Sequence, residues 1–276
     1  MAVGQLFRED LRQLAAESFE LAARHCRSCH ELHAVWPYRR LARGGGDDTS
    51  QLAEILAELA GGGPRGLLIA GAADTGLLAL AANAASGTRF TVLDRCEAPL
   101  ELCRRQARIW GLPLETMHQD LTSLDVEAQF DIVLLHGTLP YVGAECRIDV
   151  LARLRRTLCP AGRLVMLFNT GHRTSEVDAD SDYADWMLTR LDAMAVPIPE
   201  ERGKFHSRLC IRAQHHASCV RAFSEPDDVL AMLAEAGFAL DRLFEIGVKL
   251  SKAGHSSALR RTKRKFIALA RPEAGS

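Results

Sequence analysis

The chain has 276 residues, of which 47% are hydrophobic and 25% charged, proportions that are ordinary for a globular protein. Its length suits one large domain, or one domain with an appendage. The formal net charge of −1 argues against a dedicated nucleic-acid binder, because such proteins need a strongly basic surface. The basic cluster at 260–265 is expected to be a solvated loop that leads into a strand.

The sequence contains no segment of the roughly 18 consecutive apolar residues that a membrane-spanning helix needs. Its first twenty residues, MAVGQLFREDLRQLAAESFE, mix acidic and apolar side chains and lack the apolar core of a signal peptide. We therefore expect a cytoplasmic protein that contacts no membrane. Its eight scattered cysteines are expected to be reduced thiols.

Residues 1–63 are predicted to form an N-terminal helical cap that acts as a substrate lid. Apolar residues recur at helical spacing from Phe7 to about Arg24, and the same helix is expected to continue until Pro37 stops it. A second helix is expected at 51–59. The remainder, 64–276, is predicted to be a cofactor-binding domain with an insert at about 169–220.

Cysteines and histidines gather in the stretch HCRSCHELHAVW. The predicted helix would place five of them on one broad face, namely His25, Cys26, Cys29, His30 and His33. The string CRSCH also has the spacing of a c-type haem attachment site, but that attachment occurs outside the cytoplasm.

A zinc site at this stretch would need a second pair of ligands, and the sequence shows none at normal spacing. His215, His216 and Cys219 could supply them only through a coincidence of the fold. We therefore predict no metal site. We interpret the polar and aromatic side chains of this stretch as the lining of a substrate pocket, namely those of His30, His33, Trp36 and Tyr38.

Residues 66–94, GLLIAGAADTGLLALAANAASGTRFTVLD, have the pattern of a βαβ unit. An apolar strand at 67–70 leads into the small-residue turn 71–76, and a helix at 77–85 leads into a second strand at 90–93. Small residues let the backbone approach a ligand, and the N-terminus of the helix favours negative charge. Asp94 follows the second strand and can accept hydrogen bonds from both ribose hydroxyls. The unit therefore predicts a site for an adenosine-bearing cofactor.

The rest of the chain continues the alternation of strands and helices. The expected elements are a helix at 97–110, strands at 114–119 and 130–135, a helix at 145–158, a turn at 160–162 and a strand at 163–168. The insert is expected to be polar and irregular with one helix at 182–194. A helix capped by Ser224 is expected at 224–236, followed by strands at 243–250 and 266–270. This order predicts a doubly wound, seven-stranded and mostly parallel sheet that binds ligands beyond its strand carboxyl ends.

Two cofactor classes compete for the turn. Because GAADTG also fits G-x-A-x-x-G, an NAD(P)-binding oxidoreductase is a possible interpretation. Short-chain dehydrogenases would have a Tyr-x-x-x-Lys pair, but the residues four positions after the three tyrosines are Ala42, Glu145 and Met187. A dehydrogenase with a separate substrate domain would need more chain after the sheet.

The order of motifs instead resembles the class I S-adenosylmethionine-dependent methyltransferases, over roughly residues 50–271. The resemblance rests on six stretches: GLLIAGAADTG, TVLDRCEAPL, HQDL, FDIVLLHGTLPYV, LRRTLCPAGRLVMLF and SEPDDVLAMLAEAGF. The resemblance implies S-adenosyl-L-methionine as cofactor, with Asp94 on the ribose and Asp120 at the adenine end. The cofactor-binding residues that it implies are Gly71, Ala72, Ala73, Asp74, Gly76, Asp94, Arg95, Asp120, Leu121 and His136.

Two positions depart from the family pattern. The family usually has an acidic residue two positions before the first glycine of the turn, where this chain has Ile69, and Ala73 replaces a glycine. We therefore expect the methionine end of the cofactor to be held by other groups, such as Asp74 or the N-terminal helices.

Methyl transfer needs an aligned nucleophile and a dry site, and a base near neutral pKa helps when the nucleophile carries a proton. His136, at the exit of the fourth strand, is our candidate for the base or for a residue that orients the substrate, with Tyr141 as a second catalytic candidate. The Asn-Pro-Pro-Tyr motif of amino-group nucleic-acid methyltransferases is absent, and no carboxylate closely follows Leu135 to hold a catalytic metal.

We expect a small-molecule N- or O-methyltransferase of secondary metabolism that works as a monomer or homodimer. The alternatives are an RNA- or protein-modifying methyltransferase, an NAD(P)-binding oxidoreductase, and a non-catalytic metal-binding relative.

Overall fold

The computed structural model describes residues 10–27, 29–43, 50–61, 65–171, 179–220, 222–246 and 264–273. The α-helices are α1 (Leu11–His25), α2 (Leu32–Ala42), α3 (Ser50–Ala60), α4 (Gly76–Ala84), α5 (Glu97–Trp110), α6 (Arg147–Thr157), α7 (Ala179–Ala193), α8 (Arg202–Val220) and α9 (Pro226–Glu235). The strands are β1 (Gly66–Ala70), β2 (Arg89–Asp94), β3 (Leu114–His118), β4 (Phe130–His136), β5 (Leu158–Thr170), β6 (Phe238–Ile246) and β7 (Arg264–Pro272). Short 3-10 helices η1 (Leu121–Ser123), η2 (Leu139–Tyr141) and η3 (Ala144–Cys146) lie in the loops.

The strands form one seven-stranded sheet in the order β3-β2-β1-β4-β5-β7-β6. Neighbouring strands from β3 to β5 run parallel, whereas β7 pairs antiparallel with both β5 and β6. The predicted seven-stranded, mostly parallel sheet is therefore confirmed. Because the strand order reverses between β1 and β4, ligands are expected at the carboxyl ends of these two strands.

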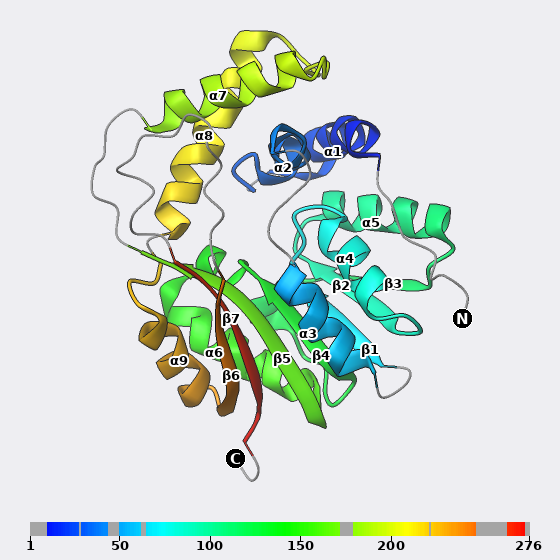
Figure 1. The fold of residues 1–276 in the computed structure, drawn as a ribbon, viewed down its shortest axis with the longest axis vertical. Coiled ribbons are helices and arrows are strands. Elements are labelled where there is room, and N and C mark those ends of the chain that lie inside the picture. Colours follow the sequence, from blue (N-terminus) through cyan, green and yellow to red (C-terminus); the bar gives the residue numbers. More distant parts are fainter. Residues whose placement is uncertain are drawn as a thin grey trace.

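Helices cover both faces of the sheet (Figure 1). Alternate residues of β1 point to opposite faces, as the period of a strand requires: Leu68 and Ala70 pack with α6 and α9, while Leu67 and Ile69 pack with α3 and α4. Both faces are apolar because parallel strands are buried on both sides. The helix α5 joins the second layer.

A helical unit stands at the end of the molecule opposite the C-terminus (Figure 1), and its helix α1 packs on α5 through Leu14 and Leu21. The helices α1 and α2 come from the N-terminal part of the chain, and α7 and α8 come from the segment between β5 and α9. Their apolar side chains form one cluster around Tyr38 and Phe205, whose rings meet edge to face at 5.1 Å between centroids. We call α1, α2, α7 and α8 the four-helix unit. By contrast, α3 packs on the sheet layer.

The prediction that Pro37 stops the first helix was wrong, because the break comes earlier and Pro37 lies inside α2. His30 and Glu31 have positive φ angles of 47° and 60°, which turn the chain between α1 and α2. Pro37 has no N–H for the carbonyl of His33 four residues before it. The buried Ser18 hydroxyl of α1 donates to that carbonyl at 2.7 Å and so satisfies it.

Three other local predictions need correction. The insert is largely helical, since α8 occupies much of the segment predicted to be irregular. Ser224 is not the N-cap of the following helix: Glu225 is, and it forms a capping box with Asp228. The predicted turn at 160–162 lies within β5, where the pairing with β4 shifts register between Phe130 and Ile132.

The predicted helix start at Phe7, the strand end at Leu250 and the first residues of the basic cluster lie outside the described residues. Arg264 of that cluster begins β7 and forms a two-pronged ion pair with Glu245 on β6, at 2.9 and 2.7 Å. Within the described ranges, no helix combines the length and the apolar character needed to cross a membrane.

Candidate functional site

The turn after β1 lies against the loop that follows β4. Gly71 has a φ of +88° and donates its N–H to the carbonyl of Leu93 on β2 at 2.8 Å. Thr138 donates its hydroxyl to the carbonyl of Ala70 at 3.1 Å, and a Cβ on Gly71 would lie 2.6 Å from the Thr138 side chain. Both the backbone angle and this contact require glycine at position 71. Thr138 thus holds the turn against the loop that follows β4.

Asp94 ends β2 beside this turn. One carboxylate oxygen accepts the N–H of Ala72 at 3.0 Å, and the other accepts the N–H of Cys96 at 2.7 Å. Burial raises the pKa of Asp94, while the nearby His33 and these two N–H groups oppose the rise. A carboxylate offers about four acceptor positions, so two remain for a ligand after these bonds.

Asp74, in the middle of the turn, is committed to contacts within the protein. Its carboxylate accepts the N–H of Gly76 at 2.8 Å, and it forms a 2.8 Å ion pair with Arg40 of α2. The side chain of Asp74 is 4% exposed and that of Arg40 is 17% exposed. Ile69, where the family pattern has an acid, is buried in the layer of α3 and α4. Ala73 is half-buried in the same turn.

The residues predicted at the adenine end lie after β3. Asp120 caps η1 by accepting both the N–H and the hydroxyl of Thr122, at 2.9 and 2.8 Å. Leu121 packs into the core beneath it. Arg95, directly after Asp94, is exposed, and its carbonyl lies 3.1 Å from Nε2 of His118.

The helix α8 reaches the exit of β4. His136 ends β4 and is half-buried, and η2 then presents Tyr141. Arg212 of α8 donates through Nη2 to the Tyr141 hydroxyl, and its guanidinium also lies over the Tyr141 ring. His215, one turn further along α8, stacks on Tyr141 with ring centroids 5.4 Å apart. Sequence reasoning missed Arg212, because the insert was expected to be irregular.

This region carries positive charge. Burial together with His30, Arg212 and Arg95 lowers the pKa of His215 to about 4, so its imidazole is neutral at neutral pH. Arg212 is only 3% exposed. Its buried Nη1 has no hydrogen-bond partner among the described residues. A buried guanidinium nitrogen without an acceptor is costly, and a bound oxygen anion would remove that cost.

The four residues predicted to line the substrate pocket occupy different environments. His30 stacks on His215 of α8 at 3.9 Å between ring centroids, and His215 in turn stacks on Tyr141. Trp36 packs under the guanidinium of Arg39. Tyr38 is buried inside the four-helix unit, where burial raises its pKa to about 12. His33 is buried against three cysteines.

These cysteines come from two distant parts of the chain. Cys26 and Cys29 belong to the turn between α1 and α2, while Cys96 is the N-cap of α5 and follows Asp94 by two residues. One ligand atom each of Cys26, His33 and Cys96 lies within 4.8 Å of the other two, and Cys26 Sγ lies 3.1 Å from His33 Nδ1. Cys29 interacts with both Cys26 and His33. Sequence reasoning missed Cys96, because no spacing links it to the other three.

We call this group the Cys–His cluster (Cys26, Cys29, His33 and Cys96). Its members have pKa values shifted in different directions. Hydrogen bonding with Cys26 lowers the pKa of Cys29 to about 3 and that of Cys96 to about 5, although burial opposes both shifts. The same hydrogen bonds raise the pKa of Cys26. Burial lowers the pKa of His33, but hydrogen bonds with Cys29 and Cys96 outweigh it and raise that pKa to about 10.

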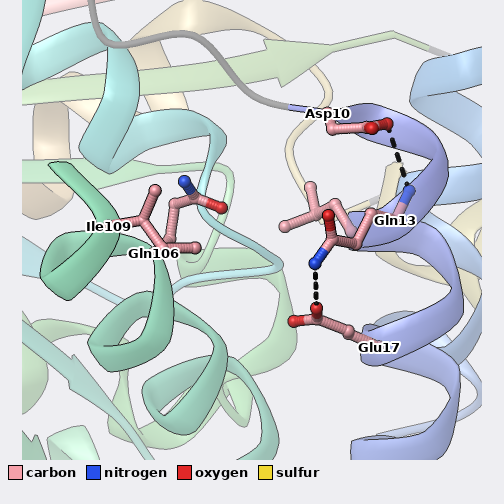
Figure 2. A pocket seen from close by; sticks show the side chains of 6 residues that line it. Asp10, Gln13, Glu17, Gln106 and Ile109 are labelled. Atoms are coloured by element: carbon pink, nitrogen blue, oxygen red, sulfur yellow. Dashed lines mark hydrogen bonds between the residues drawn. The ribbon is translucent and has the colours of Figure 1, made fainter.

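A small open recess lies elsewhere, between α1 and α5 (Figure 2). Its lining residues are Asp10, Gln13, Leu14, Glu17, Gln106 and Ile109. Its α1 wall is held by a hydrogen bond from Gln13 to Glu17 at 2.7 Å and by the Asp10 cap. No residue of the turn after β1 borders it, so this recess is separate from the candidate site.

Comparison with known proteins identifies the core of the fold. Residues 70–162 match the family described as Methyltransferase domain. A search of curated protein sequences found no significant match.

Solved structures share the fold at low sequence identity. The [4+2]-cyclase SpnF is 15% identical with a TM-score of 0.58, and the match covers 94% of this chain and 97% of that one. The 1,6-didemethyltoxoflavin-N1-methyltransferase of Burkholderia thailandensis, solved with 1,6-didemethyltoxoflavin and S-adenosylhomocysteine, is 18% identical with a TM-score of 0.53 and coverages of 98% and 93%. A TehB-like SAM-dependent methyltransferase from Corynebacterium glutamicum is 15% identical with a TM-score of 0.51 and coverages of 90% and 100%.

Proposed function

Because this chain contains a class I S-adenosylmethionine-dependent methyltransferase domain, we propose that it methylates a nitrogen or oxygen of a small molecule held beneath α8. The observation that carries the small-molecule proposal is the placement of Arg212 and His215 of α8 on Tyr141, at the exit of β4. A helix that covers the carboxyl end of the sheet suits a compact substrate better than a polymer. The dehydrogenase alternative loses its support, because the matching domain is a methyltransferase domain.

The residues of the turn fit the adenosine half of S-adenosyl-L-methionine. Gly71 gives the turn its positive φ and its close packing on Thr138, and Asp94 has acceptor positions left for ribose hydroxyls. Ile69 offers no acid to the methionine end. We propose that the turn residues 71–76 and the N-terminal helix α2, joined by the Arg40–Asp74 pair, form the wall at that end.

The bound cofactor would supply an activated methyl group, so the protein has to align the acceptor and exclude water. His136 lies at the end of β4, next to the β1 turn, and we assign it the role of orienting the acceptor or taking its proton. Tyr141 would form a wall of the pocket and, through its hydroxyl, fix the position of Arg212.

The substrate class that we favour carries an oxygen anion, such as a carboxylate or a phenolate. Arg212 is buried and has a free donor nitrogen within the described part of the chain, and Arg95 lies near enough to act on His215. Arginine is well suited to planar oxygen anions, since its donors are fixed in a fork. The ring N–H of neutral His215 can donate a hydrogen bond to the same anion.

Calorimetry with S-adenosylhomocysteine tests the cofactor site. The wild-type protein should bind it, and Asp94→Ala should weaken binding at least about 100-fold, because two hydrogen bonds to a charged acceptor are lost. Asp131→Ala is the matched control, since Asp131 also accepts a backbone N–H but near the amino end of β4. No heat of binding with folded wild-type protein would contradict the proposal.

Capture of metabolites on the protein loaded with S-adenosylhomocysteine tests the substrate class. Mass spectrometry of the bound fraction should show anionic small molecules, and Arg212→Met should lose them while it keeps the cofactor product. Co-purification of RNA, or methylation of protein fractions by the wild type, would favour the macromolecule-modifying alternative instead.

A further inference from the structure

The Cys–His cluster has the composition of a mononuclear metal site. Cys26, His33 and Cys96 also have the spacing of one, and Cys29 interacts with Cys26 and His33. Three sulfur atoms and one imidazole nitrogen are the donor set of Cys₃His structural zinc sites. With Zn–S near 2.3 Å and Zn–N near 2.0 Å, the edges of such a tetrahedron are roughly 3.5–3.8 Å. Cys26 Sγ lies 3.1 Å from His33 Nδ1, and the ligand atoms of Cys26, His33 and Cys96 all lie within 4.8 Å of one another. The edge lengths of the tetrahedron fall between these two values.

The local backbone is arranged to make this group. Cys26 ends α1, His33 is in the first turn of α2, and Cys29 lies in the turn between the two helices. That turn depends on two consecutive non-glycine residues with positive φ, His30 and Glu31. Such angles cost free energy and persist where the surroundings determine them. The C-x-x-C spacing thereby becomes one half of a chelate that Cys96 completes from the other side.

We propose that the four side chains of the Cys–His cluster bind one Zn²⁺ ion. Thiolate and imidazole ligands select zinc over hard cations such as Mg²⁺ and Ca²⁺. All four positions are filled by protein, so the ion is structural rather than catalytic. In a reducing compartment, closely spaced cysteines bind metal more readily than they form disulfides.

The zinc ion would join the four-helix unit to the cofactor edge of the sheet. Cys96 donates its N–H to Asp94, and His33 interacts electrostatically with the same carboxylate. A carboxylate behind a metal-bound histidine commonly orients the ring. Metal binding at the cluster therefore positions the residue that we assign to the cofactor ribose, and the two events should be coupled.

Elemental analysis of protein purified from zinc-supplemented cells gives the first test. We expect one zinc per chain in the wild type, its loss in Cys26→Ser and Cys96→Ser, and its retention in Cys159→Ser, whose thiol lies outside the cluster. Cobalt substitution of the wild type should give the intense thiolate-to-metal absorption of a tetrahedral site. This measurement decides the question even if the cluster variants fail to fold.

Several outcomes would overturn the proposal. These are metal-free wild type with no cobalt absorption, zinc that survives both cluster substitutions, and a disulfide among the three cysteines under non-reducing mass spectrometry. Removal of zinc by a chelator should also weaken binding of S-adenosylhomocysteine about tenfold, an ordinary coupling between two sites. Zinc content is measured without the cofactor, so loss of the methyltransferase proposal would leave the zinc result standing, and the reverse also holds.

Discussion

At the scale of single residues, Pro37 shows how a helix accommodates a residue that ought to end it. The missing N–H leaves the carbonyl of His33 without its helical donor, and the ring crowds that carbonyl. Ser18 supplies the hydrogen bond from a neighbouring helix, in a site closed to water. One buried hydroxyl therefore allows α2 to continue to Ala42.

Ser18→Ala should lower the free energy of unfolding by about 1–2 kcal/mol, because a buried carbonyl loses its partner. In a Pro37→Ala background the new N–H can donate to His33, so the same substitution should cost much less. Urea unfolding of the four proteins in this double-mutant cycle measures the coupling. Equal costs in both backgrounds would contradict the explanation. Ser207→Ala, whose hydroxyl is exposed on α8, serves as the control.

At the scale of elements, the pair of Arg40 and Asp74 fastens α2 to the turn that begins α4. The carboxylate also accepts the N–H of Gly76 at the start of that helix, where negative charge is favourable. Removal of the cation leaves a buried carboxylate without compensation, which is more costly than loss of an exposed pair.

Arg40→Gln should therefore lower the free energy of unfolding by about 3 kcal/mol and weaken binding of S-adenosylhomocysteine, because the turn loses its support. Arg202→Gln breaks the exposed pair with Asp192 and should leave the melting temperature nearly unchanged. Calorimetric melting and binding titrations provide both quantities. Similar melting temperatures for the two variants would show that burial does not decide the cost here.

The sequence predicted best the elements whose signals are local. The helix α5 spans the predicted 97–110, since its apolar stripe is regular and Gly111 ends it with a φ of +64°. The helix α8 was missed because few of its side chains are strongly apolar. Phe205, Leu209 and Arg212 nevertheless form one buried stripe at helical spacing.

In the candidate site, too, the sequence revealed only the residues that lie close together in the chain. Gly71 and Asp94 belong to one βαβ unit, so their spacing in the chain revealed them. Cys96 and Arg212 act on residues far away in sequence, on the α1–α2 turn and on Tyr141. Such tertiary contacts leave no periodic signal. Only the folded arrangement brings the third cysteine to the other two.

At the scale of the whole molecule, two distant segments build the four-helix unit. Phe205 of α8 contacts Phe19 of α1 and Tyr38 of α2, so the apolar faces of the N-terminal helices are completed by the insert. The sheet has its own two apolar layers. The two parts can therefore differ in local stability.

Phe205→Ala should cost about 3–5 kcal/mol within the four-helix unit, because it leaves a large cavity in a small core. Hydrogen exchange should then accelerate in α1, α2, α7 and α8 while β1 and β4 stay protected. The comparison variant, Phe168→Ala in the sheet core, should instead accelerate exchange across the strands. Uniform acceleration in Phe205→Ala would show that the protein opens as one cooperative unit.

Because the four-helix unit is built from two distant segments of the chain, its halves are synthesised at different times. The ribosome releases α1 and α2 first, yet α7 begins at Ala179, after the strands from β1 to β5 have been made. At about 5–20 residues per second, the roughly 140 intervening residues take on the order of ten seconds to appear. During that interval the apolar faces of α1 and α2 are open to chaperones, and to the same helices on neighbouring nascent chains.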